Sequence, residues 1–170
     1  MNRIDPIMNR RSIRKFLETP VEHEKLESVL RAAMQAPTAK NTQCWQFLVV
    51  EDRADREAVS KMSPFGMCAK NAAALIIPMV SSTVSDFWLG CWVQDLSAAC
   101  QNMLTQIEAE GLGATWLGIY PFPERVFALK EYFHLPEDVV PFSVIALGYK
   151  AKEKPFEDRY DPAKVHWGNY

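Results

Sequence analysis

Apolar side chains recur every three or four residues in two stretches of the chain, and this spacing predicts two amphipathic helices. The first follows Thr19, Pro20 and Glu22, which form a capping-box start with a proline in the first turn, and it stops before Pro37. The second runs from Phe87 to Glu110, and its apolar stripe is wide enough for a central helix. The stripe contains Leu89, Trp92, Val93, Leu96, Cys100, Met103, Leu104 and Ile107.

Local start and stop signals predict the remaining helices. Asp5 and Pro6 form an N-cap and a first helical position, so a short helix is expected to lead to Arg10. The charged stretch 52–62 and the stretch 123–133 also read as helices. Gly111 follows the predicted central helix, and we interpret it as its C-cap.

Continuous apolar runs predict the strands. The runs 47–50, 114–119 and 140–149 are typical of buried strands. The run Ala72 to Val80 is ambiguous, and we expect it to start as a helix and end as a strand, with Pro78 at a sheet edge or strand end. About four strands and five helices therefore alternate, which predicts an α/β or α+β sandwich of helices on one sheet and leaves the strand order open.

Composition narrows the class of protein. The 170 residues are 48% hydrophobic, which is enough for a single domain with a sizeable core. A net charge of -2 gives no general attraction to nucleic acid or to an anionic membrane. No apolar run approaches the roughly 18 residues of a membrane span. The four cysteines show no CxxC pair, and the first residues have no signal-peptide core, so we expect a cytoplasmic protein.

The main candidate for chemistry is the stretch Arg10 to Phe16, read as RRSIRKF. Each guanidinium offers a rigid fork of donors that matches phosphate oxygens, and the hydroxyl of Ser12 adds a short, adjustable donor. The stretch therefore suggests a phosphate site. Its alternative is a solvated basic surface, which is the more usual fate of basic runs near an N-terminus.

Four motifs, taken together, resemble the FMN-dependent nitroreductase family, and most closely its short, single-domain branch. They are RRSIRKF, then APTAKNTQxWQF from Ala36 to Phe47, then WLGIYP from Trp116 to Pro121, and finally EDRY from Glu157 to Tyr160. The resemblance implies an α+β fold with a mostly antiparallel sheet flanked by helices. It also implies an intertwined homodimer with two FMN molecules at the subunit interface.

The same resemblance implies one FMN-binding domain over residues 1–170, with the tail 150–170 packed on the partner subunit. It also implies that the central helix packs against its mate across the dimer axis. The alternative for that helix is a stripe that lies wholly within one chain.

The resemblance assigns cofactor contacts residue by residue. Arg10 and Ser12 match contacts to the phosphate and ribityl chain, with Arg11 as a helper, and Arg14 matches the cation that stabilises reduced flavin at its pyrimidine end. A loop that the partner subunit lays over the flavin is matched by Pro37, Thr38, Ala39 and Asn41, with Gln43 as an amide partner or loop anchor. The segment near flavin N5 is matched by Gly118, Ile119 and Tyr120. Arg159 matches the cation that completes the phosphate site, with Lys152 and Lys154 as possible helpers.

The implied activity is an NAD(P)H-dependent oxidoreductase. NADH or NADPH is expected to reduce the flavin and leave, after which a nitroaromatic, a quinone or a similar acceptor takes its place, a ping-pong order in which the cofactor carries the chemistry. No protein acid or base and no metal is expected, since the three histidines lack the spacing of a metal site. Aromatic candidates for the pocket, each also a candidate for the core, are Trp88, Trp116, Tyr120, Phe65 and Phe122.

Two other classes stay open at this point. One is an FMN-binding sensor or store with little turnover. The other is a different flavin enzyme on the same fold, such as a dehydrogenase, a dehalogenase or a flavin-cleaving enzyme. The sequence chooses neither between NADH and NADPH nor among acceptors.

One position departs from the family pattern. Cys44 stands after the glutamine in NTQCW, where the family often has proline. Nothing nearby in the sequence indicates a lowered thiol pKa, so we interpret Cys44 as an inert small residue, with a redox-active thiol as the alternative.

Overall fold

The structure is a computed structural model that describes residues 6–84 and 86–170, apart from the side chain of Trp88. Its centre is an antiparallel sheet in the order β1-β2-β5-β3, with β4 paired to β2 beside β5. The strands are β1 (Trp45–Val50), β2 (Ala74–Ser81), β3 (Gly113–Gly118), β4 (Val139–Pro141) and β5 (Ser143–Gly148). This confirms the expected α+β fold with an antiparallel sheet.

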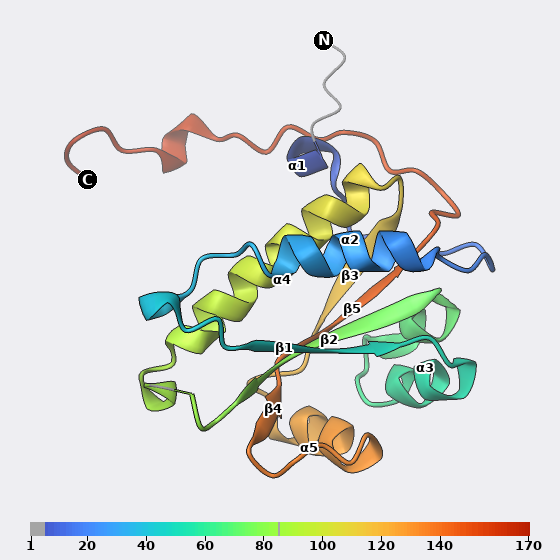
Figure 1. Cartoon of the computed structure of the whole chain (residues 1–170). Coiled ribbons are helices and arrows are strands. Elements are labelled where there is room, and N and C mark those ends of the chain that lie inside the picture. Colours follow the sequence, from blue (N-terminus) through green and yellow to red (C-terminus); the bar gives the residue numbers. More distant parts are fainter. Residues whose placement is uncertain (1–5, 85) are drawn as a thin grey trace.

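Helices cover both faces of the sheet (Figure 1). On one face lie α2 (His23–Ala33) and α4 (Cys91–Ala109), and on the other α3 (Arg53–Ser60) and α5 (Pro123–Tyr132). The short α1 (Pro6–Asn9) contacts α4. Four 3-10 turns complete the described elements: η1 (Ala39–Asn41), η2 (Gly66–Asn71), η3 (Phe87–Leu89) and η4 (Pro162–Lys164).

The sheet has a hydrophobic core on each side because successive strand residues point to opposite faces. Ile76 and Val80 of β2 pack with α2 and α4, whereas Leu75, Ile77 and Met79 pack with α3, η2 and α5. All eight residues of β2 are buried.

Strand β2 corrects the prediction for residues 72–80. The run does not start as a helix, and Pro78 lies in an inner strand. A strand buried on both faces reads as a continuous apolar run without alternation, which is why its type was ambiguous. Pro78 is tolerated because it lies where β5 stops and β4 begins, and its carbonyl accepts the Phe142 N–H at 2.9 Å. The N–H that proline lacks would point to the same side of β2 as this carbonyl, between β5 and β4, so the sheet loses no hydrogen bond there.

The start of α2 also differs from the prediction. Thr19 and Pro20 lie outside the helix, and Glu22 is the N-cap without a capping hydrogen bond from its side chain. Its carboxylate instead accepts the Tyr149 hydroxyl at 2.7 Å. A tertiary contact to the distant end of β5 therefore replaces the local capping box.

The predicted central helix is divided. Gly90 has φ 73° and separates η3 from α4. The end of α4 agrees with the prediction, because Gly111 has φ 74° and donates to the Glu108 carbonyl, while Leu112 donates to the Ile107 carbonyl. These two bonds form a Schellman motif and confirm Gly111 as the glycine that ends the helix.

The predicted strand 140–149 is likewise divided at Phe142 into β4 and β5, which gives five strands in the described part of the chain. The three shorter predicted helices are confirmed as α1, α3 and α5. The proposed N-cap Asp5 and the pocket candidate Trp88 lie outside the described residues and side chains. None of the described helices is both long and apolar enough to span a membrane.

Candidate functional site

The basic segment after α1 is held along the outer edge of β3. Ile13 donates its N–H to the Ala114 carbonyl at 2.8 Å, and Ser12 forms a parallel bridge with Ala114. Phe16 forms a second bridge, to Lys150 just after β5. The side chains of Ile13 and Phe16 are buried between these strands and η2, so the residues between them are left at the surface.

The tail after β5 returns along this segment. Ala151 donates to the Lys15 carbonyl at 3.1 Å, and the Lys154 ammonium donates to the Ser12 carbonyl at 2.7 Å. The Arg11 guanidinium donates to the Pro155 carbonyl at 3.1 Å. These bonds bring residues near 155 beside residues near 11, although more than a hundred residues separate them in the chain.

The two segments enclose a cavity of about 580 Å³, which we call the cationic cavity. Its volume lies within the roughly 300–1,000 Å³ of ordinary ligand sites. It collects the arginines and the serine that the sequence analysis assigned to the phosphate and pyrimidine ends of the cofactor, together with Lys154 and Glu157, whereas the other proposed helper, Lys152, does not line it. The predicted residues lining it are Arg10, Arg11, Ser12, Arg14 and Arg159.

The charges in the cationic cavity are unequally satisfied. The guanidinium groups of Arg10 and Arg14 have no hydrogen bond or ion pair with any described residue. Arg159 pairs with Glu157 at 3.1 Å, but both side chains are 66% exposed, and such surface pairs contribute about 0–1 kcal/mol. A phosphate can displace so weak a partner. The cavity therefore suits an anion that several guanidinium groups share.

Strand β3 connects the cationic cavity to the predicted segment Gly118, Ile119 and Tyr120. Ala114 lies beside Ser12, and Gly118 ends the strand roughly 13 Å away at about 3.3 Å per residue. No described atom lies within 4 Å of where a Cβ on Gly118 would stand. The surface beside Gly118 therefore has room for a flat ring to approach the backbone.

The predicted loop from Pro37 to Gln43 does not line the cationic cavity. Its η1 turn lies at the N-terminal end of α4, where the buried carboxylate of Asp95 accepts the Ala39 N–H at 2.9 Å. Lys40 pairs with Asp86, and Gln43 donates its N–H to the Thr38 hydroxyl. The side chains that one chain leaves exposed on this loop include Pro37, Asn41 and Gln43.

The loop holds three non-glycine residues in the left-handed region. Lys40 and Asn41 have φ 53°, and Gln43 has φ 47°. Such conformations cost on the order of 1–3 kcal/mol each and persist only where surrounding contacts fix them. The contacts of Asp95 and Lys40 supply that fixation, so the loop is shaped before any partner binds.

Cys44 lies at the end of this loop and is buried. Its thiol donates to the Asp95 carboxylate at 3.7 Å, and burial raises the pKa of the thiol. The thiol is therefore protonated near neutral pH, which agrees with its interpretation as an inert residue. The thiol of Cys100 is buried as well, and burial raises its pKa to about 12.

The aromatic candidates separate by exposure. Trp116 is half-buried, and it packs edge-on against Phe142 of the core. Phe65, Tyr120 and Phe122 are exposed in the single chain, and the Tyr120 ring contacts Trp92 with centroids 4.7 Å apart. In the described part of the chain, no group of three or more His, Cys, Asp or Glu side chains is placed to hold a metal ion.

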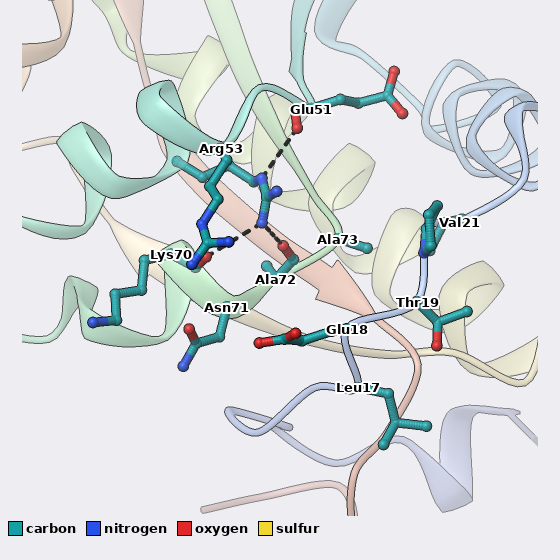
Figure 2. A pocket seen from close by; sticks show the side chains of 12 residues that line it. Leu17, Glu18, Thr19, Val21, Glu51, Arg53, Lys70, Asn71, Ala72 and Ala73 are labelled. Carbon is teal, nitrogen blue, oxygen red and sulfur yellow. Dashed lines mark hydrogen bonds between the residues drawn. The ribbon is translucent and has the colours of Figure 1, made fainter.

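A second cavity, of about 340 Å³, lies between α3 and the segment 17–21 (Figure 2). None of the predicted cofactor contacts lines it. The Arg56 guanidinium donates there to the backbone carbonyls of Glu51, Lys70 and Ala72, which joins α3 to the start of β2. We interpret Arg56 as a structural residue.

Sequence reasoning missed two residues that shape the site. Asp95 shows only as a polar position within an apolar helix stripe, and its role depends on the distant loop. Arg125 follows Pro123 in the first turn of α5 and donates to the Gly118 carbonyl at 2.9 Å. Neither residue belongs to a local motif, so no sequence signal identified them.

Comparisons with known proteins agree with this architecture. The model of the nitroreductase family matches residues 7–92 and 89–149. A protein of Archaeoglobus fulgidus named NADH dehydrogenase/NAD(P)H nitroreductase is 42% identical over 163 residues, which are 94% of this chain and 94% of that protein. The crystal structure of a protein named NADH oxidase from Clostridium acetobutylicum has a TM-score of 0.94 at 42% identity, and the match covers 98% of this chain and 100% of that one.

A solved structure named FMN-dependent nitroreductase, from Clostridium difficile, has a TM-score of 0.90 at 28% identity and covers 99% of this chain and 100% of that one. These similarities extend over nearly the whole chain and confirm both the resemblance and the fold. The chain therefore belongs to the nitroreductase family.

Proposed function

We propose that the protein is an NAD(P)H-dependent oxidoreductase that holds FMN and reduces electron-poor acceptors such as nitroaromatics and quinones in a ping-pong order. The names of its relatives support the enzyme class and the cofactor. The observation that carries the proposal is the cationic cavity, in which the guanidinium groups of Arg10 and Arg14 lack partners among the described residues and Arg159 joins them from the tail.

The residues present fit FMN. The cationic cavity supplies guanidinium donors for a phosphate, with Arg10, Ser12 and Arg159 as its ligands, and β3 leads from there to the open side of Gly118. When bound, FMN supplies the hydride chemistry between a nicotinamide donor and the acceptor. Arg14 places a positive charge where it stabilises the reduced cofactor. Arg11 holds the tail beside the cavity, because its guanidinium donates to the Pro155 and Glu157 carbonyls.

We further propose that the protein works as a homodimer whose partner loop completes the site. The loop from Pro37 to Gln43 is held in shape in each chain but lies away from the cationic cavity of the same chain. A second copy offers the same loop to that cavity.

The four cysteines are free thiols, which supports a reducing compartment, the cytoplasm.

An absorbance titration tests this function. The purified protein is expected to show flavin peaks, or to acquire them after FMN is added. Anaerobic NADH or NADPH should bleach the peaks within a turnover time, and a quinone or nitroaromatic should restore them. Peaks that neither donor bleaches would indicate an FMN-binding store or sensor. A protein that takes up no FMN would overturn the assignment of the cationic cavity.

A further inference from the structure

Arg125 lies at the end of β3, at the point where the predicted cofactor ring meets the backbone. It belongs to the first turn of α5, and its Nη1 donates to the Gly118 carbonyl at 2.9 Å. Its guanidinium carbon stands 3.9 Å from the centroid of the Phe122 ring, which is cation–π geometry. The group is thus fixed by one hydrogen bond and one ring.

The charge of Arg125 is nearly buried and poorly paired. The side chain is only 12% exposed, and its Nε is buried without a hydrogen-bond partner among the described residues. Its closest carboxylate is Glu124, at 3.9 Å, and the Glu124 side chain is 70% exposed to solvent. A buried cation without a close counter-charge is costly, and its field is weakly screened. Such a group acts strongly on charge that develops beside it.

The segment that Arg125 holds is otherwise fixed by the backbone. Tyr120 donates its N–H to the Phe142 carbonyl at 2.9 Å, and Phe122 donates to the Ile119 carbonyl at 2.9 Å. The Gly118 carbonyl is bound by the Arg125 side chain. Removing the guanidinium would therefore take away the side-chain hydrogen bond that orients this peptide group at the strand end.

We propose that Arg125 is a positioning residue for the flavin, which orients the peptide after Gly118 and keeps a positive charge at the reactive end of the site. The inference rests on the proposed function. Arg14 provides the first cation of the site, from the segment before β3, and Arg125 provides the second, from α5. Together they make the bound cofactor easier to reduce than either alone, because a fixed cation favours the more negative, reduced form.

Arg56 provides a matched control. It is also an arginine of a short helix that binds backbone carbonyls, those of Glu51, Lys70 and Ala72, but it does so at the second cavity. A role limited to holding backbone predicts the same behaviour for both arginines. A role in tuning the flavin predicts an effect for Arg125 alone.

The test compares the wild-type protein with Arg125→Met, Arg125→Lys and Arg56→Met, each loaded with FMN. The midpoint potential of the bound flavin is measured by equilibration with a reference dye, and the melting temperature is recorded for each variant. For Arg125→Met the ratio of reduced to oxidised flavin at a fixed potential should fall about tenfold, or about 30 mV for a two-electron couple. Arg125→Lys should recover most of this change, because it keeps the charge. Arg56→Met should lower the melting temperature and leave the potential unchanged.

Several outcomes would overturn the inference. One is an FMN-loaded Arg125→Met protein with the wild-type potential, and another is an equal shift in Arg56→Met, which would indicate general loosening. If Arg125→Met does not fold, Arg125→Gln replaces it, since glutamine keeps an N–H donor without the charge, and the same shift is expected. A wild-type protein that binds no FMN would overturn the proposed function itself. If NAD(P)H reduces the bound flavin but the Arg125 variants keep the wild-type potential, only the inference about Arg125 is overturned.

Discussion

Three arginines within five residues have three different surroundings, although they share one side-chain chemistry. The Arg11 side chain has a structural role. It donates to the carbonyls of Met8, Arg10 and Pro155, and its guanidinium carbon lies 5.7 Å from the centroid of the Phe156 ring. Arg10 lines the cationic cavity, and its guanidinium has no partner among the residues that the structure describes. Arg14 is exposed and lies close enough to Cys68 to lower its pKa in part, although burial has the larger effect and raises it. Only the last two are free for a ligand.

At the residue scale, Arg10→Ala is expected to weaken FMN binding by about 10- to 100-fold. Hydrogen bonds to charged groups contribute about 1.5–3 kcal/mol, and each 1.4 kcal/mol is tenfold in affinity. The change is measured by flavin fluorescence quenching at two salt concentrations, and the variant should lose part of the salt dependence. The matched control is Arg31→Ala, since Arg31 is 77% exposed on α2 and makes only a distant pair with Glu27. Equal affinity in the two variants would remove Arg10 from the phosphate site.

At the scale of elements, β3 organises the site because its two ends serve different parts of it. Its first residue, Gly113, is packed so closely that a Cβ there would stand 2.7 Å from Ile13 and 2.8 Å from Lys150. Lys150 is itself fixed by Glu108 of α4 at 2.7 Å, with both side chains largely buried. The start of β3 therefore locks the basic segment and the tail together. Its last residue, Gly118, is open.

Two glycines next to β3 give opposite predictions for substitution by alanine. Gly118→Ala should leave stability nearly unchanged, because its φ is ordinary and no described atom crowds the new methyl group, but it should weaken FMN binding because that methyl group takes the ligand's space. Gly111→Ala should instead lower stability and leave FMN binding unchanged. Its φ of 74° costs an alanine about 1–2 kcal/mol, or roughly 2–8 °C in melting temperature, with FMN affinity retained.

Thermal melting and flavin titration of both variants measure these effects. A Gly118→Ala protein that binds FMN as tightly as the wild type would show that the backbone there does not approach the ring. A Gly111→Ala protein with the wild-type melting temperature would contradict the strain assigned to the helix end.

The ends of helices that are set by nearby residues could be predicted from the sequence. Those that depend on contacts with residues far away in the chain could not. Gly111 ends α4 through bonds to residues three and five positions earlier, so a local reading sufficed. The start of α2 was wrong because Tyr149, from the far end of the sheet, takes the Glu22 side chain. The break at Gly90 was missed because the apolar stripe continues across it. A periodic apolar pattern indicates which positions are buried, but it does not indicate which residue has a positive φ.

The site shows the same division. The residues of the phosphate end were predicted from motifs and gather in one cavity, including Arg159, whose return depends on the whole sheet. Arg125 and Asp95 were missed because each acts on a backbone group of another segment, Gly118 and Ala39 respectively. No local pattern encodes such pairings.

At the scale of the whole molecule, one chain holds the two parts of the proposed site far from each other. The cationic cavity lies beside α1 and the tail, whereas the preformed loop lies at the other end of α4. The tail runs beyond α1 and away from the body of the chain (Figure 1). Its aromatic side chains are mostly exposed there, and Trp167 is 88% exposed. An ordered tail of this composition needs a surface to pack on, and we propose that the second copy in the proposed homodimer is that surface.

Removal of residues 161–170 is therefore expected to weaken the dimer while leaving Arg159 in place. Burial of one large aromatic side chain contributes about 2 kcal/mol or more, so the dimer dissociation constant should rise at least about tenfold, as measured by sedimentation equilibrium. FMN affinity should fall at protein concentrations where the shortened chain is monomeric and recover at higher concentrations, because in the proposed homodimer the partner's loop covers the cofactor. Phe127→Ser is the control, since Phe127 is 64% exposed on α5 and outside the tail, and it should leave the dimer intact. A shortened chain that dimerises as tightly as the full one would place the tail elsewhere, and a monomer that binds FMN fully would show that one chain completes the site.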